Sequence, residues 1–132
     1  MNHDIGYRVS MVEDFFGEFE RSIDPKGRIT LPSGYRGIIL ERLRLHNYKD
    51  SLADSVRIVP LTNHIKIYDA LGYERKREEI KCIAKIIYRK PIDSQGRILI
   101  LENFRGIFGD SGKVLITPSE DLDSIMVNPF NK

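Results

Sequence analysis

The sequence predicts a mainly β fold with short helices, of the α+β class, in which one unit occurs twice. Residues 19–38 (FERSIDPKGRITLPSGYRGI) return 69 positions later as residues 88–107 (YRKPIDSQGRILILENFRGI), with eight of twenty positions identical and no gap. Each copy alternates apolar and polar residues around a DxxGR motif and is followed by further short apolar runs. A repeated segment with strand periodicity indicates two copies of one β-rich unit.

A chain of 132 residues is long enough for one domain with a substantial core. We expect a single domain over residues 15–132, made of two repeats (19–68 and 88–127). Residues 1–14 lack clear periodicity and are expected to form an N-terminal extension, flexible or loosely packed.

Within each copy, two short strands flank a turn. In the first copy Phe19, Arg21 and Ile23 alternate with polar residues, and Ile29 and Leu31 do so after the turn. The apolar members of these strands are expected in one shared core: Ile23, Ile29, Leu31, Ile92, Ile98 and Ile100.

The residues of the turn have the chemistry of a hairpin. Asp24 can accept hydrogen bonds from the backbone N–H groups that follow it, and Gly27 allows the positive φ of a bulged hairpin. Asp93 and Gly96 repeat this arrangement in the second copy. These four residues are therefore predicted to form the turns rather than to contact a partner directly.

Further elements follow each turn. A short helix is predicted after Pro32, with Tyr35 on its apolar face, and its counterpart carries Phe104. The first copy has 11 extra residues near LRLHNYKDSLAD, which we expect to form a surface loop or an extended helix. Paired strands are predicted over residues 56–60 and 65–68 in the first copy, and 114–118 and 125–127 in the second.

One amphipathic helix is predicted over residues 70–87, between the repeats. Its apolar face carries Tyr73, Ile80, Ala84 and Ile87. The charged run within it has mixed signs, which is typical of a solvated helix face rather than of a nucleic-acid patch.

Charge is concentrated in the copies. The whole chain has a formal charge of +2, whereas each twenty-residue copy has four Lys or Arg against two Asp or Glu. Basic side chains at two equivalent turns form a possible footprint for an anionic partner. They could also simply solvate strand edges and discourage edge pairing.

The sequence disfavours an enzyme. The three histidines are widely spaced, Cys82 has no histidine nearby, and neither a metal-ligand cluster nor a Gly-rich phosphate loop occurs. We therefore expect no catalytic residues, no metal and no cofactor. The lone cysteine and the lack of a membrane-spanning apolar run favour a cytoplasmic location.

The segments FFGEF (15–19), DPKGRITLPSGYR (24–36) and DSQGRILI (93–100) resemble the MraZ family, which belongs with the AbrB-like swapped-hairpin domains. The resemblance covers residues 15–127 and implies an internally duplicated swapped-hairpin β-barrel. The segment between Tyr68 and Asp93 looks too short for the pair of helices usual between MraZ halves, and the chain stops soon after the last strand.

The resemblance implies a sequence-specific, nucleoid-associated transcriptional regulator that forms ring-like homo-oligomers and binds repeats in promoter DNA. Arg28 and Arg97 match the motif arginines, with Lys26 and Gln95 at the tips of the same turns. Three further residues are expected to contact phosphates: Arg21, Arg89 and Lys90.

Two alternatives remain open. Arg28 and Arg97 each follow an aspartate by four residues and could pair with it, which would make them structural. The same fold also serves antitoxin-like and protein-interaction modules that lack specific DNA binding.

Overall fold

The computed structural model describes residues 14–48, 54–100, 106–108, 112–120 and 122–130. The predicted N-terminal extension lies outside these residues except for Asp14, and so does Phe104. The first repeat contains β1 (Phe19–Ser22), β2 (Arg28–Thr30), α2 (Ser33–Leu45), β3 (Ser55–Pro60) and β4 (Ile65–Tyr68). The second contains β5 (Tyr88–Pro91), β6 (Arg97–Leu99), η2 (Gly106–Phe108), β7 (Lys113–Pro118) and β8 (Ile125–Pro129).

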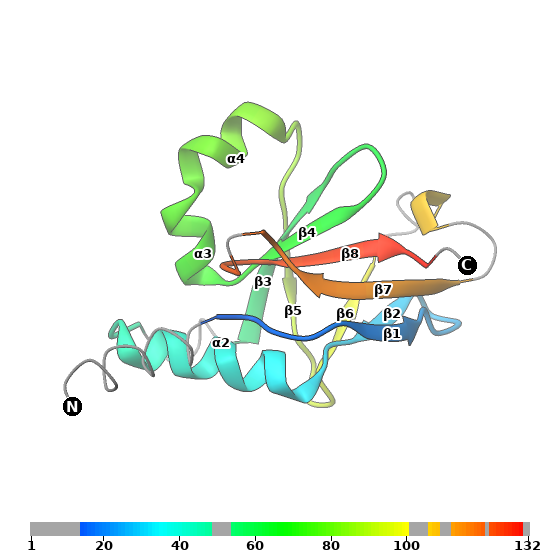
Figure 1. Cartoon of the computed structure of the whole chain (residues 1–132), viewed down its shortest axis with the longest axis horizontal. Coiled ribbons are helices and arrows are strands. Elements are labelled where there is room, and N and C mark those ends of the chain that lie inside the picture. The colour runs from blue at the N-terminus through cyan, green and yellow to red at the C-terminus, as the bar shows by residue number, and fades with distance from the viewer. Residues whose placement is uncertain (1–13, 49–53, 101–105, 109–111, 121, 131–132) are drawn as a thin grey trace.

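The strands form a six-stranded antiparallel sheet in the order β1-β7-β8-β4-β3-β5 and a separate two-stranded ladder of β2 with β6 (Figure 1). The fold is thus mainly β with a few short helices, as predicted. Among the described strands the ladders do not join into a closed barrel.

The sheet is symmetric about its centre because the repeats exchange strands. β1 of the first repeat pairs with β7 of the second, and β5 pairs with β3 in the equivalent register. Ile29 faces its own counterpart Ile98 in the middle of the β2–β6 ladder, and Lys66 faces Met126 in the middle of the β4–β8 ladder. A pseudo-twofold axis therefore passes through the centres of both ladders.

The prediction that the strands beside each turn form a local hairpin was wrong. The N–H of Asp24 donates to the carbonyl of Arg28, which closes the turn, but β1 then pairs with β7 and β2 pairs with β6. This exchange brings Ile29 and Ile98 together in one core, which a local hairpin in each repeat would not do.

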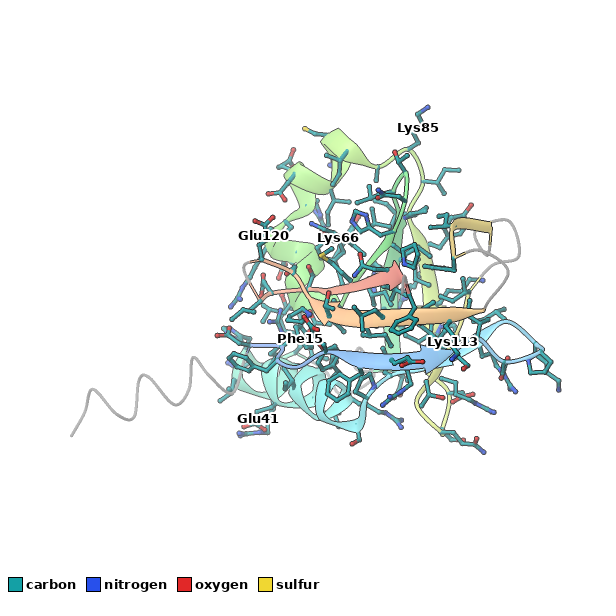
Figure 2. The ribbon with its side chains drawn as sticks, turned by 45° about the vertical axis from the view of Figure 1, so that its right-hand side comes forward. Phe15, Glu41, Lys66, Lys85, Lys113 and Glu120 are labelled. Carbon is teal, nitrogen blue, oxygen red and sulfur yellow. The ribbon has the colours of Figure 1, made fainter. Side chains whose placement is uncertain are left out.

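That core lies between the ladder, helix α2 and one face of the sheet. Of the six core residues predicted, five are buried and Ile23 is partly buried. Tyr35 of α2 is also buried, as predicted, and its ring meets Phe15 edge to face at 5.4 Å between centroids. Phe15 comes from the segment before β1 (Figure 2).

The extra residues of the first repeat begin as helix. Helix α2 runs for 13 residues to Leu45 and ends at His46. Its inner face carries Arg42, which is completely buried and forms an ion pair with Asp69 at 2.9 Å (Nε to Oδ2) and with Asp123 at 2.8 Å (Nη1 to Oδ1). Asp69 also caps α3 (Ala70–Arg75) by accepting the N–H of Gly72.

The single helix predicted over residues 70–87 was wrong in extent. The structure has two short helices, α3 and α4 (Arg77–Ile83), separated at Lys76. From Ala84 the backbone is extended, because the chain must reach β5, and an extended residue advances about 3.3 Å against 1.5 Å in a helix. The segment is thus long enough for two short helices. Its predicted apolar face is correct, since Ile80 is buried with Val59 and Tyr68 on the sheet face opposite the main core.

Candidate nucleic-acid interface

The two DxxGR turns have the same hydrogen bonds, atom for atom. In the first, Oδ1 of Asp24 accepts the N–H groups of Lys26 (2.9 Å) and Arg28 (2.8 Å), and Oδ2 accepts Nε of Arg28 at 2.8 Å. Asp93 accepts the corresponding three groups of Gln95 and Arg97, at 2.9, 2.8 and 2.7 Å. The shape of each turn is therefore set by one carboxylate.

Glycine is required at the end of each turn. Gly27 has φ +86° and Gly96 has φ +80°, in the left-handed region that residues with a Cβ rarely adopt. The carbonyl of each glycine accepts an N–H from the other repeat: Gly27 from Ile100 at 2.7 Å, and Gly96 from Leu31 at 2.9 Å. Each turn is thus attached to the strand that follows the other turn.

These bonds place the turns at opposite ends of the β2–β6 ladder. Gly27 lies opposite Ile100 and Gly96 opposite Leu31, so the two glycines are four residue steps apart, about 13 Å along a strand. The tip residues Lys26 and Gln95 are both exposed.

The outer face of the ladder connects the two turns. Ile29 and Ile98 are fully buried beneath it, so the alternating residues face outward: Arg28 opposite Leu99, and Thr30 opposite Arg97. The outer face is therefore a short two-stranded ribbon with an arginine near each end. We call Lys26, Arg28, Thr30, Gln95, Arg97 and Leu99 the ribbon surface.

Arg28 and Arg97 do pair with the aspartates of their turns, an alternative that the sequence left open. The pairing still leaves part of each guanidinium available to a binding partner. Arg28 and Arg97 use Nε for the aspartate, and among the described residues their terminal nitrogens make no hydrogen bond. Each side chain keeps about a quarter of its surface exposed (27% and 26%). Anchoring through Nε fixes the guanidinium plane, so the structural and functional roles are compatible.

The pKa values of the two aspartates reflect this arrangement. The backbone N–H of Arg28 lowers the pKa of Asp24 below its ordinary value of 3.8, and the backbone N–H of Arg97 does the same for Asp93. In each turn the arginine guanidinium adds to the effect. Both carboxylates therefore remain ionised at neutral pH, where their oxygens accept the hydrogen bonds of the turn.

The expected phosphate-contacting residues divide between the two sheet faces. Arg21 lies opposite Val114 and Lys90 opposite Val56, so both side chains lie on the face that carries the core and the ladder. They occupy equivalent positions on the edge strands β1 and β5. Arg89 lies opposite Arg57 on the other face, away from the ribbon surface.

Sequence reasoning missed two residues of this region. Thr30 and Leu99 complete the outer face, and the exposure of Leu99 (39%) could have been read from its alternation with the inward Ile98 and Ile100. Arg36 of α2 donates to the carbonyl of Ser94 at 3.4 Å, which links the first repeat to the second turn.

The described residues contain no group of three or more His, Cys, Asp or Glu side chains placed to hold a metal ion. Within the same residues, none of the helices is long and apolar enough to cross a bilayer.

Comparison with known proteins gives a consistent relationship. The chain is 32% identical over 113 residues to the transcriptional regulator MraZ of Corynebacterium kroppenstedtii, covering 84% of this chain and 79% of that protein. It is 26% identical over 112 residues to the MraZ of Leuconostoc citreum (81% and 76%) and 26% identical over 106 residues to that of Mycoplasmoides gallisepticum (77% and 73%). No family model matches the chain. The identity and coverage of these relatives show that the chain belongs to the MraZ family.

Proposed function

We propose that the protein is a transcriptional regulator that binds double-stranded DNA through the ribbon surface. The observation that carries the proposal is the antiparallel pairing of β2 with β6, which places both DxxGR turns and both motif arginines on one outer face. A two-stranded ribbon fits the major groove of B-DNA, where each base pair presents a distinct pattern of donors and acceptors. The exchanged pairing also supports a swapped-hairpin arrangement.

Within this surface the side chains have different tasks. Arg28, Arg97 and Lys26 can donate to guanine N7 and O6, and Gln95 can form two hydrogen bonds with adenine. Leu99, exposed between the arginines, offers an apolar contact for a thymine methyl group. Because Asp24 and Asp93 hold the arginines in advance, binding freezes less side-chain motion.

Arg21 and Lys90 lie at the two edges of the same sheet face. We assign them phosphate contacts on either side of the groove, where they position the ribbon without reading sequence. Arg89 faces the other way and is not part of the ribbon surface.

Selection of bound sequences from a random duplex pool tests the proposal. Enrichment of a motif, present as direct repeats, is the expected result for a regulator that acts on promoter repeats in the nucleoid. Failure to retain even unspecific DNA at low salt would instead favour an antitoxin-like or protein-interaction module, because electrostatic binding to phosphates should be strongest there.

We also propose that the chain forms ring-like homo-oligomers of more than two subunits. Several large apolar side chains are exposed in the isolated subunit, including Leu40 (52%) and Ile86 (53%), and neighbouring subunits could cover them. Light scattering at tens of micromolar protein tests this, and a monomeric mass would contradict it.

A further inference from the structure

A second group of arginines lies on the sheet face opposite the ribbon surface. Arg57 of β3 is directly opposite Arg89 of β5, so their side chains share one face of the sheet. Arg89 leans along that face, with Nε 3.3 Å from the hydroxyl of Ser55. The guanidinium of Arg57 lies over the ring of Tyr73 at 5.3 Å, and that of Arg77 lies over the same ring at 5.8 Å.

The part of the protein that the structure describes does not neutralise these charges. Among the described residues neither Arg57, Arg77 nor Arg89 forms an ion pair with a carboxylate, and the buried Nη1 of Arg57 has no hydrogen-bond acceptor. Burial, and after it the charge of Arg89, lowers the pKa of Arg57. Like charges directly opposite each other in a ladder destabilise it, and the ring of Tyr73 compensates only in part.

The other half of the sheet has the same register without such a pair. The positions equivalent to Arg57 and Arg89 in the other half of the sheet are Leu115 and Glu20, which are paired in the same register. The same local backbone thus accepts an aliphatic residue and a carboxylate. The two arginines therefore need an explanation other than folding.

We propose that Arg57 and Arg89, with Arg77 at the margin, form a binding site for a phosphate-type oxyanion. Guanidinium groups bind phosphate oxygens through paired N–H donors, and an anion between two arginines is attracted to both, which offsets their mutual repulsion. The phosphate could belong to the DNA backbone or to a free phosphate-bearing small molecule. The site itself does not depend on the DNA-binding role of the ribbon surface.

Inorganic phosphate is the probe, and the melting temperature of the full chain is the first measurement. Phosphate at tens of millimolar, against chloride at equal ionic strength, should raise the melting temperature of the wild-type protein by several degrees. Arg57→Leu, which installs the residue found at the equivalent position of the other repeat, should abolish that rise. Arg44→Leu removes an exposed arginine of α2 and should keep it.

DNA binding is the second measurement and separates the two sources. If the anion is a backbone phosphate, Arg57→Leu should reduce the slope of log affinity against log salt by about one. If the slope is unchanged while the response to phosphate is lost, the site serves a free ligand.

The proposal fails if phosphate stabilises the wild-type protein and Arg57→Leu equally, or if neither phosphate nor DNA binding responds to the substitution. Should Arg57→Leu not fold, Arg89→Gln changes an exposed side chain and is read in the same way. Loss of DNA binding by the ribbon surface would leave the phosphate measurement intact, so the two proposals can fail separately.

Discussion

Arg28 and Arg97 occupy diagonal positions on the outer face of one two-stranded ladder, although they are 69 residues apart in the sequence. Arg28 is opposite Leu99, and Arg97 is opposite Thr30. The Cα atoms of such diagonal neighbours lie about 7 to 8 Å apart. The duplication thus produces one surface with two related arginines rather than two separate sites.

The first prediction concerns this surface. Lys26→Ala with Arg28→Ala, and Gln95→Ala with Arg97→Ala, should each weaken DNA binding while the fold survives. Each base contact that is lost should cost about 1 to 3 kcal/mol of binding free energy and relax the sequence preference. Each phosphate contact that is lost should lower the salt slope by about one. In an oligomer every subunit carries the defect, which multiplies it.

Lys81→Ala with Lys85→Ala is the matched control for the first pair. It removes the same two charges from α4 and the segment after it, and Lys85 projects away from the body of the protein (Figure 2). A fall in affinity equal to that of the ribbon variants would mean that only net charge matters. A large fall in melting temperature for the ribbon variants would show that the arginines chiefly hold the turns.

The second prediction is a pH dependence of stability. The pKa values of Asp24 and Asp93 are lowered in the folded state, so their stabilising effect is complete above the ordinary value of 3.8 and is lost as pH falls through the folded values. Denaturant unfolding should show wild-type stability decreasing below about pH 4. Asp24→Asn with Asp93→Asn should be less stable at pH 6 and should depend less on pH in this acid window.

Glu120→Gln serves as control for that comparison, because it changes an exposed carboxylate away from the turns. Its unfolding curve should keep the wild-type pH dependence. An unchanged acid limb in the double aspartate variant would show that the turns are not held by their carboxylates.

The turns and the ribbon residues differ in how far the sequence could predict them. The DxxGR motif predicts the conformation at Gly27 and Gly96, because hydrogen bonds to the aspartate and a positive φ are local requirements. Local alternation predicted the partners of β1 and β2 wrongly, since it fits a hairpin and an exchanged pair equally well. Only the burial of Ile29 against Ile98 decides between them, and that contact is tertiary.

The segment between the repeats was likewise predicted only in part. Its apolar positions predicted Ile80 correctly as a buried residue, because helical periodicity records which face is covered. The break at Lys76 and the extended chain after Ile83 follow from the distance to β5, which the sequence does not contain. Arg57 and Arg89 likewise stand 32 positions apart, and strand register alone brings them together.

The third prediction concerns the buried arginine of α2. Arg42→Met should destabilise the protein by about 3 to 5 kcal/mol, because it leaves the carboxylate of Asp69 buried without its main partner. Burial already raises the pKa of Asp69, and the charge of Arg42 opposes that rise. The loss should therefore be larger at neutral than at acid pH, which denaturant unfolding can measure.

Adding Asp69→Asn to Arg42→Met should recover part of that loss, since the buried charge is removed and the amide oxygen can still cap α3 by accepting the N–H of Gly72. Arg44→Met, two positions along the same helix, changes an exposed side chain paired with Glu41 and should have little effect. Equal destabilisation by both arginine substitutions would contradict a special role for the buried pair.

The last prediction uses the one difference between the two turns that bears on base recognition. The tips carry Lys26 and Gln95 at equivalent positions of a pseudo-twofold surface, so a single subunit should prefer a site whose two halves differ, with guanine favoured under Lys26 and adenine under Gln95. Gln95→Lys places a lysine at both tips, and Lys26→Gln places a glutamine at both tips.

Selection from a random duplex pool should therefore return an asymmetric motif for the wild-type protein and more nearly palindromic motifs for both variants, richer in guanine for Gln95→Lys and in adenine for Lys26→Gln. Because Arg28 and Arg97 remain, Lys26→Gln should lower the overall affinity only by the effect of one lost charge, and that effect should be smallest at high salt. The same motif from all three proteins would show that the tips contact only the DNA backbone, and specificity would then reside in the two arginines and in Leu99 between them.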